Sequence, residues 1–324
     1  LENLMAHIFI KDVTAGKQID DIYMVHDPIL RSTTNGGLYI AMYLSDKTGQ
    51  LNGRMWQATE SAYNSLPKPG FIRVQGRSEL YQNNLQIVVN QFQTIEAEQV
   101  EISDFLARTD KNRKEMFEEI VAMLGKIKNE QIAMLIGAFI ADKELMKNFC
   151  QAPAAVKMHH NFIGGLLEHT NGMMKVANVI LPFYPKVDGD LVLAGIFLHD
   201  MGKTEELSYD MAFEYTDSGQ LIGHISKGIM MLQRKADDLA EAGKVVDKNV
   251  LDLLGHIILA HHGQYEFGSP KLPATAEAFM VNYIDDLDAK MSQVTSAIDE
   301  EPGDSNWTGW QGSLGTRLYR KTLE

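Results

Sequence analysis

The sequence predicts a two-domain protein in which a small β-barrel is followed by an all-α helical bundle. Three observations predict this order. A chain of 324 residues is long enough for two domains. Short strand-like runs separated by turn signals fill the first part, and from about residue 112 the apolar residues recur at helical spacing. We therefore expect a barrel at 1–98, a polar, turn-forming linker at 99–111 and a helical domain at 112–324 that ends in a C-terminal tail.

The first domain is predicted to be a barrel because its apolar runs are short and separated by turn residues. Residues 39–44 end at a turn-forming Ser-Asp-Lys-Thr-Gly segment, and residues 51–56 can return as the partner strand of a hairpin. A Pro-Gly pair precedes residues 71–76, and residues 85–89 form a further apolar run. About five short strands in so short a segment suggest a small Greek-key barrel. The pattern by itself does not separate an OB-fold from an SH3-like barrel.

The second domain is predicted to be helical because its apolar residues recur every three or four positions. Within this domain, residues 213–222 look like a small hairpin over the histidine-rich segments. The expected helices cover about 116–127, 132–140, 164–181, 189–201, 224–241, 248–262 and 273–298.

The composition is that of an ordinary soluble globular protein, with 45% hydrophobic and 23% charged residues. No apolar run reaches the roughly 18 residues of a membrane span, and no charged segment followed by an apolar signal core opens the chain. The single cysteine, Cys150, excludes an internal disulfide and is typical of a small core residue. We therefore expect no membrane contact and a cytoplasmic location.

The net charge argues against a generic nucleic-acid-binding protein, because such proteins usually present a basic patch. The chain carries a net charge of −13 at pH 7. This charge is unevenly spread, since residues 1–98 carry −2 and the remainder carries −11. A bound pair of divalent ions would add about four positive charges to the acidic part and would change the field where chemistry occurs.

Histidines and aspartates gather in the apolar stretches of the helical domain. Burying such groups without a partner costs several kcal/mol, and a metal ion would supply that partner. Imidazole nitrogen and carboxylate oxygen together suit Mn, Fe, Co, Zn or Mg. A single histidine is explained as well by a hydrogen-bonded place in the core, so the prediction depends on the whole set. The set is His169, the adjacent His199 and Asp200, His224, the adjacent His261 and His262, and Asp285.

In order and local context, these residues resemble the signature of the HD-domain metal-dependent phosphohydrolases. That signature is a histidine, then an adjacent His-Asp pair, then a later aspartate, and His169, His199–Asp200 and Asp285 match it. The resemblance covers about 155–295, which would be the core of the helical domain. It implies an all-α fold whose metal ligands come from several helices.

A narrower resemblance covers nearly the whole chain. A β-barrel followed by an HD domain is similar to the YhaM-type 3′-to-5′ exoribonucleases, which pair an OB-fold with an HD domain. The segments that carry it read GGLLEHT at 164–170, HDMGK at 199–203 and DDLDAK at 285–290. The resemblance implies that the barrel is an OB-fold that binds nucleic acid. It also implies hydrolysis of single-stranded RNA, or of DNA, from the 3′ end to nucleoside monophosphates.

The resemblance further implies two divalent ions, because His224 and His261 are similar to the additional histidines of two-metal HD branches. It implies Mn, while ligand softness leaves Fe, Co, Ni, Zn and Mg open. Two ions about 3.5–4 Å apart can activate a water and hold a phosphate. The first ion would take His169, His199, Asp200 and Asp285, and the second would share Asp200 and take His224 and His261.

Asp200 is the expected catalytic centre, because its two carboxylate oxygens can contact both ions. Lys203 lies one helical turn later, where it could contact a substrate phosphate or could be a solvated lysine at a helix end. His262 is either a further metal ligand or a phosphate contact. His160 has either a substrate-phosphate role or a capping role. The neighbouring Glu205–Glu206 pair is interpreted as a solvated charge run.

The barrel carries aromatic residues interleaved with cations, a composition that binds single strands by stacking and phosphate contact. Most of these aromatic residues are expected to fill the barrel core. Arg54, Trp56 and Arg73 are the surface candidates for substrate contact. Near the C-terminus, Trp307 and Trp310 could cover the active site, dock a neighbouring subunit of a homo-oligomer, or pack as part of the tail.

Three functions are compatible with this pattern. The leading hypothesis is a metal-dependent 3′-to-5′ exonuclease whose barrel feeds a single strand to the HD site. The second is an HD phosphohydrolase of free or cyclic nucleotides with a regulatory barrel, which the acidic charge slightly favours. The third is a nucleic-acid-binding protein whose metal is structural, and the complete ligand set followed by Lys203 argues against it.

Overall fold

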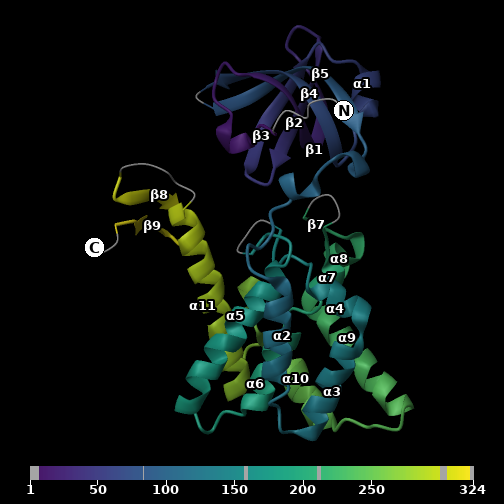
Figure 1. The fold of residues 1–324 in the computed structure, drawn as a ribbon, viewed down its shortest axis with the longest axis vertical. Helices are drawn as coiled ribbons and strands as arrows, with labels where there is room; N and C mark the ends of the chain where they lie inside the picture. The colour runs from purple at the N-terminus through teal and green to yellow at the C-terminus, as the bar shows by residue number, and fades with distance from the viewer. Residues whose placement is uncertain (1–6, 83, 157–159, 210–212, 300–304, 322–324) are drawn as a thin grey trace. The chain divides into compact units, whose positions relative to one another are not determined.

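The chain forms two compact units, one ending at Arg108 and the other beginning at Thr109. Each unit has its own hydrophobic core. The division falls inside the segment predicted as the linker, and the domain limits at 98 and 112 stay predictions. The computed structural model describes residues 7–82, 84–156, 160–209, 213–299 and 305–321 (Figure 1).

Five strands of the first unit form a closed barrel in the order β1-β2-β3-β5-β4, and β4 pairs back with β1. The β3–β5 pair is parallel, and the other pairs are antiparallel. This five-stranded Greek-key barrel confirms the prediction of an OB-fold. The strands are β1 (Gln18–Ser32), β2 (Leu38–Asp46), β3 (Gly49–Trp56), β4 (Gly70–Tyr81) and β5 (Asn84–Ile95), and α1 (Glu60–Ser65) lies between β3 and β4.

The barrel core follows from the alternation of side chains along each strand. In β2, Ile40, Met42 and Leu44 are buried, while the residues between them are partly or fully exposed. These inward residues pack in one cluster with Ile72 of β4 and Ile87 of β5. The alternation therefore leaves the outer face of β2 and β3 free to carry aromatic and cationic side chains.

The segment before β1 is held to the barrel by a partly buried ionic cluster. His7 Nδ1 lies 3.2 Å from Asp21 Oδ1, and His7 Nε2 lies 3.4 Å from Asp46 Oδ2. Burial lowers the pKa of His7, but the two carboxylates outweigh burial and raise this pKa to about 9. Burial would raise the pKa of Asp21 and of Asp46, but His7 and nearby backbone N–H groups hold both below the usual range.

This cluster predicts how barrel stability depends on pH. Because the folded pKa of His7 lies above its ordinary 6.5, its contribution is full below pH 6.5 and is lost as the pH rises to about 9. The contributions of Asp21 and Asp46 have the opposite sign and are lost as the pH falls below the ordinary carboxyl range. We expect the free energy of unfolding of the barrel to be highest between about pH 4.5 and 6.5.

Trp56 fluorescence can measure this stability, because the other two tryptophans of the chain can be replaced by Trp307→Phe and Trp310→Phe. In that background, urea unfolding should show a stability that declines from pH 6.5 to pH 9. His7→Gln should remove the decline. His26→Gln is the control, because the His26 ring bonds Ser45 Oγ. A decline that persists unchanged in His7→Gln would contradict the assignment.

The segment 99–111 is attached to a different unit at each end. Phe105 and Leu106 are buried in the first unit, and the Phe105 ring lies 4.8 Å from the ring of Phe71. Thr109, the first residue of the second unit, donates its backbone N–H to Ile163 O at 3.0 Å. Short 3₁₀ helices also occur in both units. They are η1 (Ile10–Asp12), η2 (Ala97–Gln99), η3 (Ile102–Asp104), η4 (Leu181–Phe183) and η5 (Tyr265–Phe267).

One helix, α6 (Gly189–Leu198), is central to the second unit. Every residue from 191 to 198 is buried, as its continuously apolar sequence requires. Asp188 caps its N-terminus by accepting hydrogen bonds from the backbone of residues 190 and 191. The helices around it are α2 (Arg113–Leu124), α3 (Glu130–Ala141), α4 (Lys143–Phe149), α5 (Gly165–Ile180), α7 (Lys203–Glu206), α8 (Asp217–Ile222), α9 (His224–Glu241), α10 (Lys248–Ala260) and α11 (Ala276–Asp299).

The prediction of a hairpin at 213–222 is wrong for most of that segment. Residues 217–222 form α8, because the Thr216 side chain accepts a hydrogen bond from the Gly219 backbone N–H at 2.8 Å and starts a helix. Two short strands, β6 (Leu207–Ser208) and β7 (Glu214–Tyr215), pair before it.

The segment expected to be a C-terminal tail contains an antiparallel hairpin. Its strands are β8 (Trp307–Gln311) and β9 (Thr316–Tyr319), and both contact α11 (Figure 1). None of the helices in the described part of the chain is long and apolar enough to cross a membrane.

Candidate metal centre

The adjacent His199 and Asp200 lie where the central helix α6 ends. His199 still donates its backbone N–H to Gly195 O at 2.8 Å, and the chain then turns tightly into α7, with Lys203 N donating to Asp200 O at 2.9 Å. Both His199 and Asp200 are buried. The sequence therefore places a carboxylate at the end of an apolar helix, inside the core of the unit.

Gly202 brings this turn against the start of α9. A Cβ atom at position 202 would lie 2.0 Å from His224 O and 2.8 Å from Gly228 N, distances that no side chain can occupy. The absence of a side chain therefore lets the two backbones touch. This contact places Asp200 beside His224, although 24 positions separate them in the sequence.

One group of side chains faces Asp200 Oδ2. His169 comes from α5 and Asp285 from α11, and His169 Nε2 lies 3.2 Å from Asp285 Oδ1. His169 Nε2 lies 3.9 Å from Asp200 Oδ2, and His199 Nε2 lies 3.3 Å from the same oxygen. One ligand atom each from His169, His199 and Asp200 all lie within 4.8 Å of one another. The structure thus brings together the four residues predicted for the first ion.

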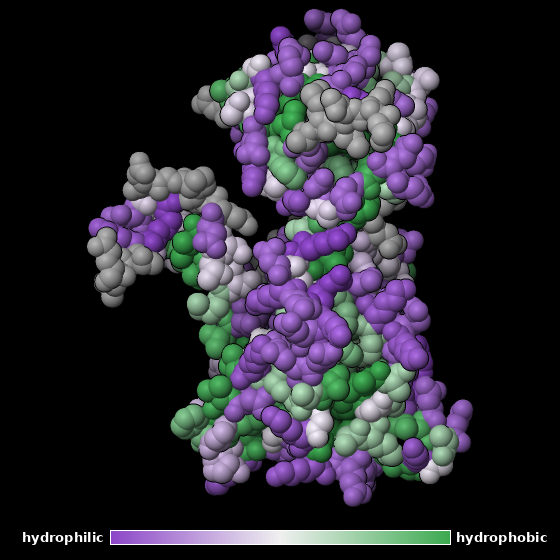
Figure 2. Space-filling model, in the orientation of Figure 1, coloured by the Kyte–Doolittle hydropathy of each residue, from purple (hydrophilic) through white to green (hydrophobic). Residues whose placement is uncertain are grey.

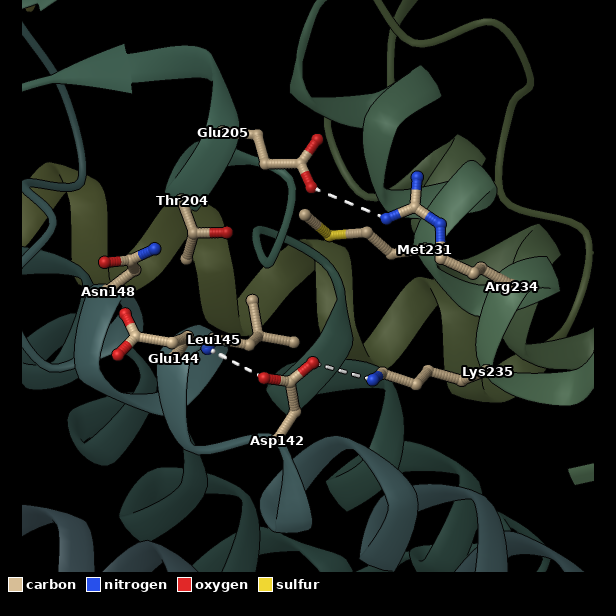
Figure 3. Close-up of a pocket in the computed structure, with 9 residues that line it drawn as sticks. All are labelled: Asp142, Glu144, Leu145, Asn148, Thr204, Glu205, Met231, Arg234 and Lys235. Atoms are coloured by element: carbon tan, nitrogen blue, oxygen red, sulfur yellow. Dashed lines mark hydrogen bonds and ion pairs between the residues drawn. The ribbon is translucent and has the colours of Figure 1, made fainter. Parts of the chain in front are cut away.

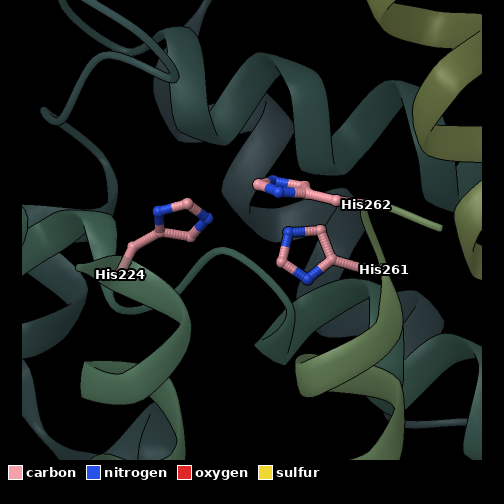
Figure 4. A group of neighbouring side chains, drawn as sticks. All are labelled: His224, His261 and His262. Atoms are coloured by element: carbon pink, nitrogen blue, oxygen red, sulfur yellow. The ribbon is translucent and has the colours of Figure 1, made fainter. Parts of the chain in front are cut away.

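A second group faces the other oxygen of Asp200. His224 Nε2 lies 3.5 Å from Asp200 Oδ1, and His261 Nε2 lies 3.6 Å from it. The rings of His224, His261 and His262 point toward one another from the start of α9 and the end of α10 (Figure 4). One ring nitrogen from each of these three histidines lies within 4.8 Å of the others. His262 therefore stands beside His261 as a candidate ligand.

These atoms fit a metal, because several of them are buried without a hydrogen-bond partner. Among the described residues, the buried atoms without such a partner include His199 Nε2, Asp200 Oδ1, His224 Nε2 and His261 Nε2. Unpaired buried polar atoms are costly, and here they converge on one carboxylate. Imidazole nitrogens with a carboxylate form the donor set of a divalent transition metal.

The protonation states of Asp200 and His261 also suit metal ligands. Burial would raise the pKa of Asp200, but Lys203 and the surrounding histidines hold it well below its usual range. Burial and the neighbouring His262 and His199 lower the pKa of His261. Asp200 is therefore ionised and His261 neutral at pH 7, the forms in which these groups bind metal. Burial lowers the pKa of His169, but hydrogen bonds to Asp285 and Asp288 raise it to about 9, so this imidazole releases a proton when it binds an ion.

Lys203 lies on Asp200 in this structure. Its Nζ is 2.6 Å from Asp200 Oδ2, and only 12% of its side chain is exposed. Burial would lower the pKa of Lys203, but the charge of Asp200 raises it. The lysine is therefore not a solvated helix-end residue. Its role toward a substrate phosphate stays a prediction.

Two residues of the site were missed by sequence reasoning. Glu206 was interpreted as solvated, but it is buried and accepts a hydrogen bond from the His224 backbone N–H at 2.8 Å. Asp288 accepts hydrogen bonds from His169 Nδ1 at 2.7 Å and from His160 Nε2 at 3.0 Å. The interpretation of Glu205 as exposed holds. A signal for Asp288 was its position one turn after Asp285, whereas Glu206 gave none.

The barrel residues predicted to contact substrate lie in two places. Arg54 lies over the rings of Tyr39, Trp56 and Tyr81, at 5.9, 5.8 and 5.3 Å from their centroids. Trp56 and Tyr81 are exposed. Arg73 lies on β4, where its Nε donates to Asp20 Oδ1 at 2.7 Å. Arg54 and Trp56 therefore form one aromatic and cationic surface, and Arg73 makes its own ion pair.

A cavity of about 230 Å³ lies among α4, α7 and α9, and the metal-binding candidates are not in its lining (Figure 3). Four of its charged residues form two pairs, and Glu144 pairs with Lys147 outside the lining. Lys235 Nζ donates to Asp142 Oδ2 at 2.8 Å, and Arg234 lies 3.8 Å from Glu205 Oε1. Because these charges neutralise each other, the cavity offers no reactive group comparable to the histidine cluster.

Comparison with known proteins places the chain in a family. The HD domain family matches residues 166–290, which contain His169, Asp200 and Asp285. The 3′-5′ exoribonuclease YhaM of Bacillus subtilis is 33% identical over 291 residues, which cover 89% of this chain and 90% of that protein. The protein of the same name from a Geobacillus species is 31% identical over 89% of this chain and 88% of its own length.

One of the solved structures that resemble this chain matches the barrel. The second OB-fold domain of replication protein A from Methanococcus maripaludis is 22% identical and has a TM-score of 0.24. It covers 29% of this chain and 99% of that domain. The curated relatives, by contrast, extend over both units. The chain carries an HD domain and belongs to the family of the YhaM 3′-5′ exoribonucleases.

Proposed function

We propose that this protein degrades single-stranded RNA from its 3′ end, releasing nucleoside monophosphates, with two divalent ions at the HD site. The observation that carries the proposal is the position of Asp200. Its two carboxylate oxygens face two separate groups of histidines, as expected of a residue that bridges two ions. The identity with the YhaM exoribonucleases over most of the chain supports RNA as the substrate class.

The ligands divide between the two ions as follows. His169, His199 and Asp285 would hold the first ion, and His224, His261 and His262 would hold the second, with Asp200 shared by both. When bound, the ions supply an activated water and neutralise phosphate charge. Histidine-rich coordination favours Mn, Fe, Co, Ni or Zn over Mg, and we propose Mn as the ion used.

The chain's own residues supply the remaining features of the site. Lys203 holds a positive charge beside Asp200 Oδ2, and we propose that it contacts a substrate phosphate. The buried walls exclude bulk water from Asp200, which strengthens each charged interaction there.

We propose that the outer face of β2 and β3 binds the single strand. In OB-folds this face commonly binds oligonucleotides. Tyr39 pairs with Trp56 across the two strands, and their rings lie 5.0 Å apart. Arg54 lies near both rings, so the surface combines stacking platforms with a cation, the composition that binds single strands without sequence preference.

Trp56→Ala tests this surface. Stacking of one base on an aromatic side chain contributes about 1–3 kcal/mol, so the Kd for labelled single-stranded RNA should rise roughly 5- to 150-fold. Fluorescence anisotropy in an inactive Asp200→Asn background measures the Kd without cleavage. Phe183→Ala is the control, because Phe183 is an exposed aromatic residue on the helical unit. Equal affinity of Trp56→Ala and Phe183→Ala for RNA would contradict the proposal that the outer face of β2 and β3 binds the strand.

The principal rival is a phosphohydrolase of free or cyclic nucleotides. The acidic net charge of −13 favours a small substrate over a long polyanion. Comparing kcat/KM for a 3′-free oligonucleotide, a mononucleotide and a cyclic nucleotide separates the two activities. A mononucleotide or cyclic nucleotide cleaved faster than every oligonucleotide would replace the exonuclease with this rival. A third function, binding of nucleic acid with a structural metal, requires that no substrate be cleaved.

We also propose a homo-oligomer that acts in the cytoplasm. Tyr283, Leu287 and Met291 are exposed at four-residue spacing along α11, and apolar residues show at the surface along this helix (Figure 2). Exposed apolar stripes of this kind mark contact surfaces between proteins. The lone Cys150 and the proposed RNA substrate support the cytoplasm as the site of action. The molar mass of the full chain in solution tests the oligomer.

A further inference from the structure

Each metal group contains one histidine backed by a carboxylate, and its other histidines, His262 with Phe267 O among them, are backed by main-chain carbonyls. In the first group, His169 Nδ1 faces Asp288 Oδ2 at 2.7 Å, whereas His199 Nδ1 donates to Ile196 O at 2.7 Å. In the second group, the equivalent pair is His224 and His261. His224 Nδ1 lies 3.2 Å from Glu206 Oε1, whereas His261 Nδ1 donates to Ile258 O at 2.8 Å.

The two backbone acceptors belong to the helices that carry the histidines themselves. Ile196 and Ile258 each lie three residues before their histidine, so these contacts form whenever α6 and α10 form. The two carboxylates come from other segments. Asp288 reaches His169 of α5 from α11, and Glu206 reaches His224 of α9 from α7. The carboxylates are therefore separate residues that can be changed without altering the helices that carry His169 and His224.

The position of the Asp288 carboxylate is set by contacts with several neighbouring residues. His160 Nε2 lies 3.0 Å from the same oxygen that His169 contacts. Gly172, one turn after His169, leaves room for the carboxylate, because a Cβ there would lie 3.0 Å from Asp288 Oδ1. Two histidines from different segments and a glycine thus define the place of one carboxylate.

Glu206 is buried where α7 ends. Its Oε1 accepts a hydrogen bond from the His224 backbone N–H at 2.8 Å, in addition to facing His224 Nδ1. Its backbone carbonyl accepts hydrogen bonds from Thr216 N at 2.9 Å and from Thr216 Oγ1 at 3.2 Å. The position of Glu206 is therefore fixed from both sides, with its carboxylate toward the second metal group.

We infer that Asp288 and Glu206 are positioning residues, each of which sets the affinity of one of the two metal ions. The inference rests on the two-metal site of the proposed function. A carboxylate only accepts hydrogen bonds here, so it holds the proton on Nδ1 and leaves the lone pair of Nε2 directed at the metal. It also makes the imidazole a stronger donor to the ion than a carbonyl partner does. Loss of such a partner weakens metal binding about 10- to 100-fold.

Metal binding to the full-length protein tests the inference. Isothermal titration of metal-free protein with Mn gives the number of sites and the affinity of each. Asp288→Asn should weaken one site about 10- to 100-fold and leave the other unchanged, and Glu206→Gln should do the same for the other site. Anomalous scattering from crystals grown at limiting Mn then shows which ion remains. We expect the ion beside His224 in Asp288→Asn and the ion beside His169 in Glu206→Gln.

Two neighbouring residues provide matched controls. Glu205→Gln removes an exposed carboxylate next to Glu206, and Asp286→Asn removes an exposed one next to Asp285 that pairs with Lys290. Both variants should bind Mn as the wild type does. If Glu206→Gln does not fold, Glu206→Asp keeps the charge and should restore folding with a weakened second site.

The outcomes separate the inference from the function on which it rests. Unchanged affinity at both sites in Asp288→Asn and Glu206→Gln, with two ions bound by the wild type, would overturn the positioning roles alone. An equal loss at both sites in either variant would overturn the separate control of the two ions. Fewer than two ions per wild-type chain would overturn the two-metal site itself.

Discussion

Replacing Asp200 by asparagine is expected to remove nearly all activity on RNA. Asparagine keeps the size of the side chain but replaces one of the two carboxylate oxygens, and the negative charge, by a neutral amide. One of the two histidine groups then loses the carboxylate oxygen that faces it. Metal ions contribute several kcal/mol to such reactions, so the rate should fall about 10³-fold or more.

The same change has a structural cost that needs its own control. Lys203 is mostly buried and paired with Asp200, so the variant leaves an uncompensated charge that costs up to about 3–5 kcal/mol. Asp200→Asn combined with Lys203→Met removes both charges and should recover much of that stability while staying inactive. Single-turnover cleavage rates and thermal unfolding measure the two effects. A double variant that regains activity together with stability would show that Asp200 acts on the fold rather than on the chemistry.

Gly202→Ala is expected to lower the stability of the helical unit strongly. The added Cβ would meet the His224 carbonyl at 2.0 Å, and this neighbour is backbone that cannot rotate away. The turn after Asp200 must then separate from α9, which costs about 3 kcal/mol and lowers the Tm of the helical unit by roughly 6–12 °C. The same displacement moves Asp200 away from His224, so binding of the second ion should also weaken.

Gly137→Ala is the matched control for this prediction. Gly137 lies on the exposed side of α3, and a Cβ there would have no atom within 4 Å. Alanine is the better helix former, so this change should raise stability by up to about 1 kcal/mol. Differential scanning calorimetry compares the two variants. A Gly202→Ala protein as stable as the wild type would show that the close approach of α7 and α9 is not required.

The grouping of the candidate metal ligands could be predicted because each lies in a pattern that is local in sequence. His199 and Asp200 follow an apolar run that is too uniform to be anything but a buried helix, and α6 is indeed buried throughout. Asp285 follows Val281 and Ile284, both of which are buried, so its place on α11 directs it inward as well. Helical periodicity alone therefore put these residues in the core.

Glu206 could not be predicted in the same way. The pair Glu205–Glu206 looks solvated, and Glu205 is. Glu206 is buried because its partner is the backbone N–H of His224, which the close approach at Gly202 brings near. No residue type marks a backbone partner that lies 18 positions away. Tertiary contact, rather than local pattern, decides such positions.

The strand β1 was also missed, although the barrel itself was predicted. Asp20 and Asp21 interrupt its apolar pattern, and Pro28 lies where the pairing with β2 shifts register, between His26 and Ile29. The acidic pair has other partners, since Asp21 faces His7 and Asp20 faces Arg73. Polar residues with specific partners interrupt the alternation of apolar and polar residues, so a strand that contains them cannot be predicted from that alternation.

The measurement that tests the central claim most directly is a time course of 5′-labelled single-stranded RNA with purified full-length protein and Mn, beside Asp200→Asn. We expect the wild type to produce a ladder that shortens steadily from the 3′ end, with nucleoside monophosphates as products, and the variant to leave the strand intact. A strand that stays full length although the wild type binds two Mn ions, or one that is shortened equally by Asp200→Asn, would contradict the proposal that this HD site is the centre of an exoribonuclease.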